Sequence, residues 1–209
     1  MLSTKFKKLR DTNILKLCSA PISNSFAKIL DVGCGPTSYK FFKSLYKNYV
    51  GLDWIVPADI IQDLNKNPRL GFTDNYFDVI ICTEVLEHLF YPDKVILELK
   101  RVLRTGGIAI ISLPNEQEIW QRIGMLLGFK FKKGFDDIGG HRWYGNVDAC
   151  ETFVKKYFKI FTKKYVGFFI DGHFADRYGA LVPWCLRESM ANLRPNLFAR
   201  QTIFYCIKN

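Results

Sequence analysis

The chain has 209 residues, of which 48% are hydrophobic, so it is long enough to form one domain with a substantial core. It contains no apolar run of about 18 residues or more, which disfavours a membrane-spanning helix. The basic N-terminus lacks the apolar stretch of a secretory signal. The net charge of +10 raises nucleic acid and an anionic membrane surface, contacted peripherally, as partners.

The cysteines and histidines show no metal-binding pattern. No pair of cysteines has Cys-x-x-Cys spacing and no pair of histidines has ligand spacing, so no metal site is predicted. Cys34 and Cys82 fall within predicted core segments, where they act as small, reduced apolar side chains. Reduced thiols favour a cytoplasmic location.

The basic residues gather in segments 5–10, 122–133 and 155–164. We interpret these segments as solvated surface. The alternative is a patch that docks phosphate-bearing substrates or acidic head groups. No RNA- or DNA-recognition motif accompanies the charge, so a nucleic-acid partner rests on electrostatics alone and is not favoured.

In chain order, the first expected element is a helix within residues 1–26. Phe6, Leu9, Ile14 and Leu17 follow helical spacing, and Pro21 ends the helix. We expect this segment to pack beside or over the pocket described next.

Residues 28–36 are the most informative part of the chain. Ile29, Leu30 and Val32 predict a strand buried on both faces, as in a parallel sheet. Gly33 and Gly35 then allow a sharp turn and a close approach of the backbone to a ligand. Asp31, near the carboxyl end of the strand, can accept hydrogen bonds from a cationic or hydroxylated group. This pattern predicts a small-molecule pocket at the strand ends of an open α/β sheet.

The glycine pattern also bears on the ligand. A dinucleotide fingerprint requires a third glycine where this chain has Ser38, and Pro36 removes a backbone donor, so a dinucleotide is disfavoured. Residues 31–37 instead resemble motif I of class I S-adenosylmethionine-dependent methyltransferases, with Thr37 in place of the last glycine. An acidic loop with few donors suits a ligand that carries a sulfonium and an ammonium group.

The next predicted strands also end in acids. Residues 49–54 predict a strand ending at Asp53, whose carboxylate would accept hydrogen bonds from both ribose hydroxyls. Trp54 would lie against the adenine. Residues 58–64 predict a third strand, and the resemblance implies that the acid at Asp63 meets the adenine amino group.

A fourth buried strand is predicted at 77–82. It is followed by Thr83-Glu84-Val85-Leu86-Glu87-His88, which resembles the Glu-Val-Leu-Glu-His segment of small-molecule methyltransferases. The resemblance implies that Glu84 faces the methionine end of the cofactor, whereas we expect Glu87 to face solvent or cap a helix. The cofactor, S-adenosyl-L-methionine, would then be bound by Asp31, Gly33, Cys34, Gly35, Asp53, Trp54, Asp63, Leu64, Thr83 and Glu84.

Alternation of strands and helices predicts a doubly wound, parallel sheet. Helices are expected near 38–47 and at 92–103, with glycine after the second helix, and a fifth strand at 108–115. Residues 115–145 break the alternation and predict a lid insertion with a short apolar helix. A helix at 146–157, capped by Asn146 or Asp148, precedes strands at 158–170 and 202–207.

The resemblance implies a Rossmann-like α/β fold with a mostly parallel seven-stranded sheet. Its last two strands would form an antiparallel C-terminal hairpin. We expect residues 1–209 to form a single methyltransferase domain.

The histidines are the candidate catalytic groups. His141 lies in a Gly-Gly-His-Arg-Trp segment that resembles a Gly-His-x-Arg-Phe segment of small-molecule methyltransferases. We interpret it as a general base or acceptor-orienting group, with lid packing as the alternative. His88 is either catalytic or purely structural, and His173 lies in a turn. Arg142 would grip an anionic acceptor group, although a surface ion pair is the common fate of an arginine.

We therefore expect a methyltransferase that acts on a small-molecule acceptor, with oxygen as the leading acceptor atom. The chain resembles the group that includes ubiquinone-type and sugar O-methyltransferases. Three alternatives remain open: an RNA or protein methyltransferase that uses the basic surface, a non-catalytic cofactor-binding protein, and a nicotinamide oxidoreductase.

Overall fold

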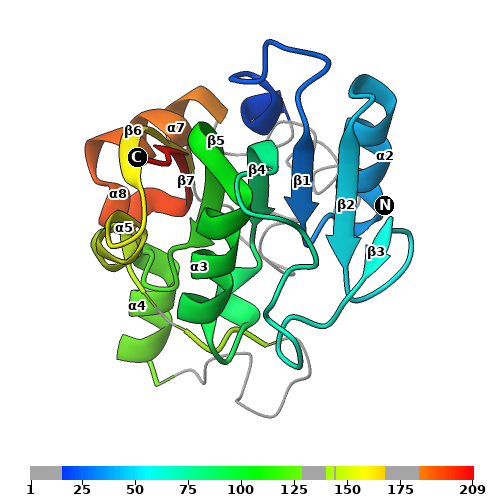
Figure 1. Cartoon of the computed structure of the whole chain (residues 1–209). Coiled ribbons are helices and arrows are strands. Elements are labelled where there is room, and N and C mark those ends of the chain that lie inside the picture. The colour runs from blue at the N-terminus through cyan, green and yellow to red at the C-terminus, as the bar shows by residue number, and fades with distance from the viewer. Residues whose placement is uncertain (1–15, 129–139, 144, 168–183) are drawn as a thin grey trace.

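The computed structural model describes residues 16–128, 140–143, 145–167 and 184–209 (Figure 1). Its strands are β1 (Ile29–Val32), β2 (Tyr49–Asp53), β3 (Ile60–Ile61), β4 (Phe77–Thr83), β5 (Leu103–Pro114), β6 (Lys159–Gly167) and β7 (Ala199–Ile207). They form one seven-stranded sheet in the order β3-β2-β1-β4-β5-β7-β6. The first five strands pair in parallel, and β7 lies antiparallel between β5 and β6. The predicted fold and its antiparallel C-terminal hairpin are confirmed.

Helices connect these strands in the expected alternation. They are α2 (Gly35–Leu45), α3 (Pro92–Val102), α4 (Ile119–Leu126), α5 (Val147–Lys155), α7 (Trp184–Leu193) and α8 (Pro195–Phe198), with a 3₁₀ turn, η1 (Leu86–His88), after β4. Within the described residues, no helix has both the length and the apolar composition needed to cross a membrane.

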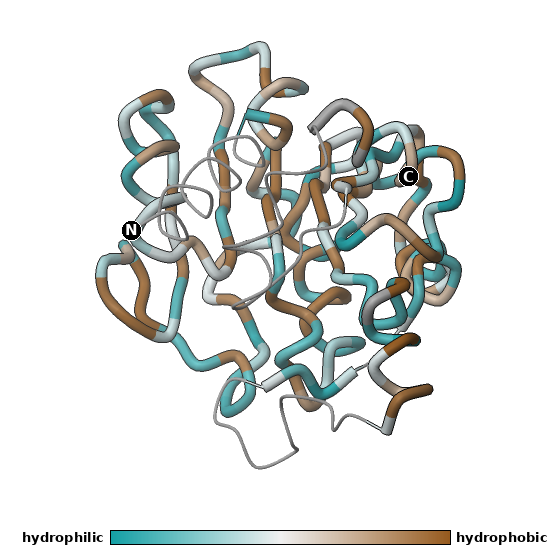
Figure 2. Tube along the Cα trace, turned by 180° about the vertical axis from the view of Figure 1, so that it is seen from behind, coloured by the Kyte–Doolittle hydropathy of each residue, from teal (hydrophilic) through white to brown (hydrophobic). Residues whose placement is uncertain are grey.

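Each face of the sheet has its own core because side chains alternate along every strand. Leu30 and Ile80 belong to a core with the apolar side of α3, which lies in front of the sheet in Figure 1. Their neighbours Ile29 and Ile81 point the other way, into a core shared with Phe42 of α2. Figure 2 shows hydrophobic residues along the central strands, as expected for strands covered on both sides.

Several predicted boundaries were wrong. The helix predicted near 38–47 begins at Gly35, because Pro36 fits the first turn of a helix. The third strand contains only Ile60–Ile61 of the predicted residues 58–64.

The glycines expected after the second helix instead lie within β5. The pairs Phe77↔Leu103 and Val79↔Ile108 follow one another in the ladder between β4 and β5, so residues 104–107 of β5 have no partner in β4. Gly106, with a φ of 71°, is one of these unpaired residues. A left-handed backbone there lets β5 bulge and resume pairing. The early strand start, rather than a glycine cap, therefore ends α3.

Some predictions lie outside the described residues. Residues 16–19 are helical, but the rest of the expected leading helix falls in residues 1–15. The end of the strand predicted at 158–170, His173 and most of the predicted lid beyond α4 also fall outside. The described part of that lid segment contains α4, the short apolar helix that was expected there, and its last residues, Met125 and Leu126, are exposed together with Leu127.

Candidate active site

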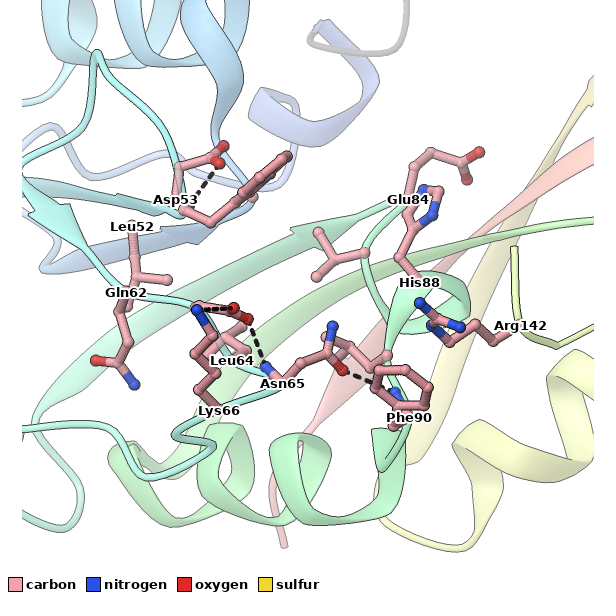
Figure 3. A pocket seen from close by; sticks show the side chains of 15 residues that line it. Leu52, Asp53, Gln62, Leu64, Asn65, Lys66, Glu84, His88, Phe90 and Arg142 are labelled. Carbon is pink, nitrogen blue, oxygen red and sulfur yellow. Dashed lines mark hydrogen bonds and ion pairs between the residues drawn. The ribbon is translucent and has the colours of Figure 1, made fainter. Parts of the chain in front are cut away.

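A cavity of about 620 Å³ lies at the carboxyl ends of β1, β2 and β4 (Figure 3). This is the edge of the sheet where open α/β folds bind ligands, and the volume suits a ligand of nucleoside size. Six of the ten predicted cofactor residues line it: Gly33, Asp53, Trp54, Asp63, Leu64 and Glu84.

Gly33 begins the turn after β1 and lines the cavity. Its φ is +69°, and a Cβ atom on it would lie 2.2 Å from Cγ2 of Val85. The backbone N–H of Gly33 donates to the carbonyl of Leu52 at 2.8 Å, which ties the turn to β2. A side chain here would strain the backbone and collide with the cavity wall.

Asp53 ends β2 with its carboxylate held in place. One oxygen accepts from the Gly35 N–H at 2.9 Å, and the other accepts from the Trp54 N–H at 2.7 Å. The residue is only 7% exposed. Two backbone donors thus fix an acceptor on the cavity wall before any ligand arrives.

Asp63 and Trp54 border the same end of the cavity. The Asp63 carboxylate accepts from the Asn65 N–H at 2.9 Å and lies 3.6 Å from the Lys66 ammonium. Trp54 is 60% exposed, so its ring is available on the cavity rim.

Glu84 follows β4 in a left-handed conformation, with a φ of 55°. Its backbone N–H donates to Ser112 Oγ at 3.1 Å, and the Ser112 hydroxyl donates back to Glu84 Oε1 at 3.1 Å. Gln201 of β7 donates to the same hydroxyl at 2.8 Å. Desolvation raises the pKa of Glu84, although the side chain opens onto the cavity. Sequence analysis missed Ser112 and Gln201, because only the sheet brings these strands together.

Four predicted cofactor residues lie outside the cavity lining: Asp31, Cys34, Gly35 and Thr83. Asp31 is fully buried, and one of its oxygens accepts from the hydroxyls of Ser38 at 2.6 Å and Tyr49 at 2.8 Å. Desolvation raises its pKa to about 7. The structure thus places Asp31 in the packing beneath α2, and Gly35 acts on the cavity through its bond to Asp53.

His88 and His141 lie together, with ring centroids 4.7 Å apart in an edge-to-face arrangement. His88 lines the cavity, and its Nδ1 lies 3.3 Å from the Gly140 carbonyl oxygen. Nδ1 of His141 contacts a carboxylate oxygen of Glu116. Glu116 was not predicted, and its position just after the fifth strand is the one sequence signal that points to it.

Glu87 corrects the expectation that this residue faces solvent. It is completely buried, and neither carboxylate oxygen has a hydrogen-bond partner among the described residues. The 3₁₀ turn directs the side chain inward, whereas its carbonyl accepts from the Arg142 N–H at 2.7 Å. Desolvation, together with the nearby charge of Glu84, raises the pKa of Glu87 well above its usual range.

Arg142 lines the cavity beside His88. Its guanidinium lies over the Phe90 ring, 3.7 Å from the ring centroid. The Nε atom is buried and has no hydrogen-bond partner within the described part of the chain. Figure 3 shows Glu84, His88 and Arg142 on one side of the cavity and Asp53 on the other.

Residues 30–111, which include β1 to β5, match the family model described as a methyltransferase domain. A methyltransferase from Archaeoglobus fulgidus, described as S-adenosylmethionine-dependent, superposes with a TM-score of 0.63 at 13% identity, over 95% of this chain and 94% of that one. Residues 30–111 therefore carry the sequence pattern of a methyltransferase domain, and the chain as a whole shares its fold with a methyltransferase described as S-adenosylmethionine-dependent.

The similarity to curated relatives covers only part of each protein. The mitochondrial ubiquinone biosynthesis O-methyltransferase of Candida albicans is 30% identical over 114 residues, which cover 45% of this chain and 34% of that protein. The tRNA U34 carboxymethyltransferase of Campylobacter jejuni is 31% identical over 137 residues, which cover 56% of this chain and 46% of that protein. Both matches therefore span less than half of the relative.

Proposed function

We propose that this protein transfers a methyl group from S-adenosyl-L-methionine to an oxygen of a small-molecule acceptor. The observation that carries the proposal is a single cavity that runs from Asp53 and Asp63 to His88 and Arg142. The donor nucleoside would occupy the acidic end, and the acceptor would enter at the end with the basic groups.

The acidic end fits the donor. Asp53 presents a fixed acceptor for two ribose hydroxyls, Asp63 for the adenine amino group, and Trp54 an exposed ring for the adenine face. The missing side chain at Gly33 leaves room for close approach. Glu84 would attract the ammonium of the methionine part. When bound, the cofactor supplies a methyl group already activated on a sulfonium, so the protein forms no covalent intermediate.

The other end fits a hydroxyl acceptor. A hydroxyl must lose its proton as its oxygen is methylated, and a neighbouring histidine can accept it. Because Nδ1 of His141 is engaged by Glu116, its Nε2 is the ring nitrogen left for the acceptor. Arg142, stacked on Phe90, would hold an anionic group of the acceptor. The cavity volume of about 620 Å³, shared with the donor, favours a small acceptor.

A second candidate is methylation of RNA. The net charge of +10 and the similarity to the Campylobacter tRNA enzyme support it. An active chain that modifies RNA would show steep salt dependence of RNA binding.

We further propose that the protein is cytoplasmic, that the chain forms one domain, and that the described part of residues 115–145 acts as a lid over the cavity.

Calorimetry with S-adenosylhomocysteine tests the donor site. We expect saturable binding that is weakened roughly 10- to 100-fold, about 1–3 kcal/mol, by Asp53→Ala, because the backbone donors and ligand hydroxyls lose their acceptor. Asp74→Ala is the control, because this acid has an exposed side chain that pairs with Arg101. Equal affinity of folded Asp53→Ala and the unmodified chain would refute the assignment.

The acceptor is tested by incubating the purified protein and donor with a metabolite extract and, separately, with total RNA. We expect mass spectrometry to find a metabolite that gains the mass of one CH₂ group. Methylation of RNA alone would overturn the small-molecule proposal and leave the donor site intact. Donor binding without methylation of either pool would favour the non-catalytic alternative.

A further inference from the structure

Glu87, His88 and His141 form a cluster beside the cavity. One ligand atom from each residue lies within 4.8 Å of those of the other two. The first two residues come from η1 and the third from the segment before α5, so their spacing in the sequence carries no metal-binding signal. Only the fold brings this carboxylate and these imidazoles together.

The carboxylate of Glu87 is buried without a hydrogen-bond partner among the described residues. The residue is 0% exposed, and both oxygens are without a hydrogen bond among the residues that the structure describes. Burying such a group alone is costly, so buried carboxylates are paired or coordinate metals. A cation between Glu87 and the two histidines would supply the missing interaction.

The surroundings of the histidines match those of metal ligands. A ligating histidine commonly uses its other ring nitrogen to contact a carboxylate or a backbone carbonyl, which fixes its orientation. Nδ1 of His141 contacts the Glu116 carboxylate, and Nδ1 of His88 lies 3.3 Å from the Gly140 carbonyl oxygen. His141 would therefore coordinate through Nε2, and His88 would offer one of its ring nitrogens.

We propose that Glu87, His88 and His141 bind one divalent first-row transition-metal ion at the acceptor end of the cavity. Two imidazoles and one carboxylate suit Zn²⁺, Fe²⁺, Co²⁺ or Mn²⁺, whereas Mg²⁺ and Ca²⁺ prefer all-oxygen sites. Three protein ligands leave coordination positions open, as in catalytic rather than structural metal sites.

The metal would serve the proposed reaction, and this part of the inference rests on the proposed function. His88 lines the cavity, so an acceptor hydroxyl there can occupy an open coordination position. With the metal bound, Nε2 of His141 is a ligand and no longer accepts the proton of the acceptor. The metal instead lowers the pKa of the coordinated hydroxyl, and the proton is released to water, which makes the oxygen a better nucleophile. Arg142 would hold a more distant anionic group of the same acceptor.

The site is tested on the full chain after treatment with a chelator. Co²⁺ alone is titrated while its visible absorption is recorded, and Zn²⁺ alone is titrated by calorimetry. We expect one equivalent of each metal to bind. Glu87→Gln and His141→Gln should weaken binding at least tenfold, and Glu116→Gln roughly 10- to 100-fold through the orientation of His141.

Glu151→Gln is the matched control, because this partly exposed glutamate of α5 pairs with Lys155 of the same helix and with Lys163 of β6. It should bind metal like the unmodified chain. S-adenosylhomocysteine binding, measured in every variant, shows that the fold and the donor site persist. It also separates failure of the metal site from failure of the proposed function.

Two results would overturn the inference. One is the absence of stoichiometric metal binding by the unmodified chain. The other is unchanged metal affinity in both Glu87→Gln and His141→Gln. Loss of metal binding in both variants with donor binding retained would support it.

Discussion

At the residue scale, backbone conformation decides which side chains reach the cavity. Gly33 provides space because it has no Cβ, and Glu84 reaches the cavity from a left-handed backbone that few residues other than glycine adopt. The hydrogen bonds between Glu84 and Ser112 hold this unusual conformation in place. Strained positions of this kind gather at functional sites.

Gly33→Ala tests the turn directly. The added Cβ would meet Val85 at 2.2 Å and would sit on a backbone with a φ of +69°. We expect a loss of about 1–3 kcal/mol in the free energy of unfolding and at least tenfold weaker binding of S-adenosylhomocysteine. Urea unfolding and calorimetry measure the two effects.

Gly71→Ala is the control for this substitution, because nothing lies within 4 Å of the position that a Cβ would take there and the backbone is not left-handed. It should change neither quantity. If Gly33→Ala has the same stability and donor affinity as the unmodified chain, the turn does not require a residue without a Cβ atom.

At the element scale, the ends of strands and helices place the functional groups. β2 and β4 deliver Asp53 and Glu84 to the same edge of the sheet, because parallel strands end together. The short 3₁₀ turn after β4 then directs Glu87 inward and His88 toward the cavity. An α-helical continuation would have put different side chains on these two faces.

Helix α5 follows the segment that holds His141 and depends on its N-cap. The Asn146 side chain accepts from the Ala149 N–H at 2.9 Å. We expect Asn146→Ala to lower the free energy of unfolding by about 1 kcal/mol, measured by urea denaturation. Asn146→Asp, which keeps an acceptor, should retain most of the stability. Equal losses in both variants would show that the cap bond contributes little.

At the scale of the whole molecule, a hydrophobic core lies on each face of the sheet, and a carboxylate is buried beside the core on the α2 side. Asp31 is fully buried on the α2 side, with one oxygen unpaired among the described residues. Desolvation raises its pKa to about 7, from about 3.9 in an unfolded chain. The folded state therefore retains a proton that the unfolded state releases.

This difference makes stability depend on pH. The contribution of the retained proton is full below about pH 4 and is lost as the pH rises through about 7. Relative to Asp31→Asn, the unmodified chain should therefore lose up to about 1.4 kcal/mol of unfolding free energy per pH unit between these values. Denaturation series at several pH values measure the difference. A gap between the two chains that stays constant with pH would contradict the assignment.

Most of the fold could be predicted because hydrophobic periodicity is local. Runs such as Ile29 to Val32 and Phe77 to Cys82 identify buried strands without any knowledge of their neighbours. The bulge at Gly106 could not be predicted in this way, because the early start of β5 is decided by its pairing with β4. The inward direction of Glu87 likewise depends on what packs around η1.

The sequence by itself determined the alternation of strands and helices, the glycine turn after β1 and the acids at successive strand ends. Each of these features depends only on residues that are close together in the sequence. Only the tertiary structure decided that Asp31 is buried beneath α2 and that Glu116, His141, His88 and Glu87 meet beside one cavity. Such contacts join distant segments, and burial and electrostatics at those contacts exist only once the chain has folded.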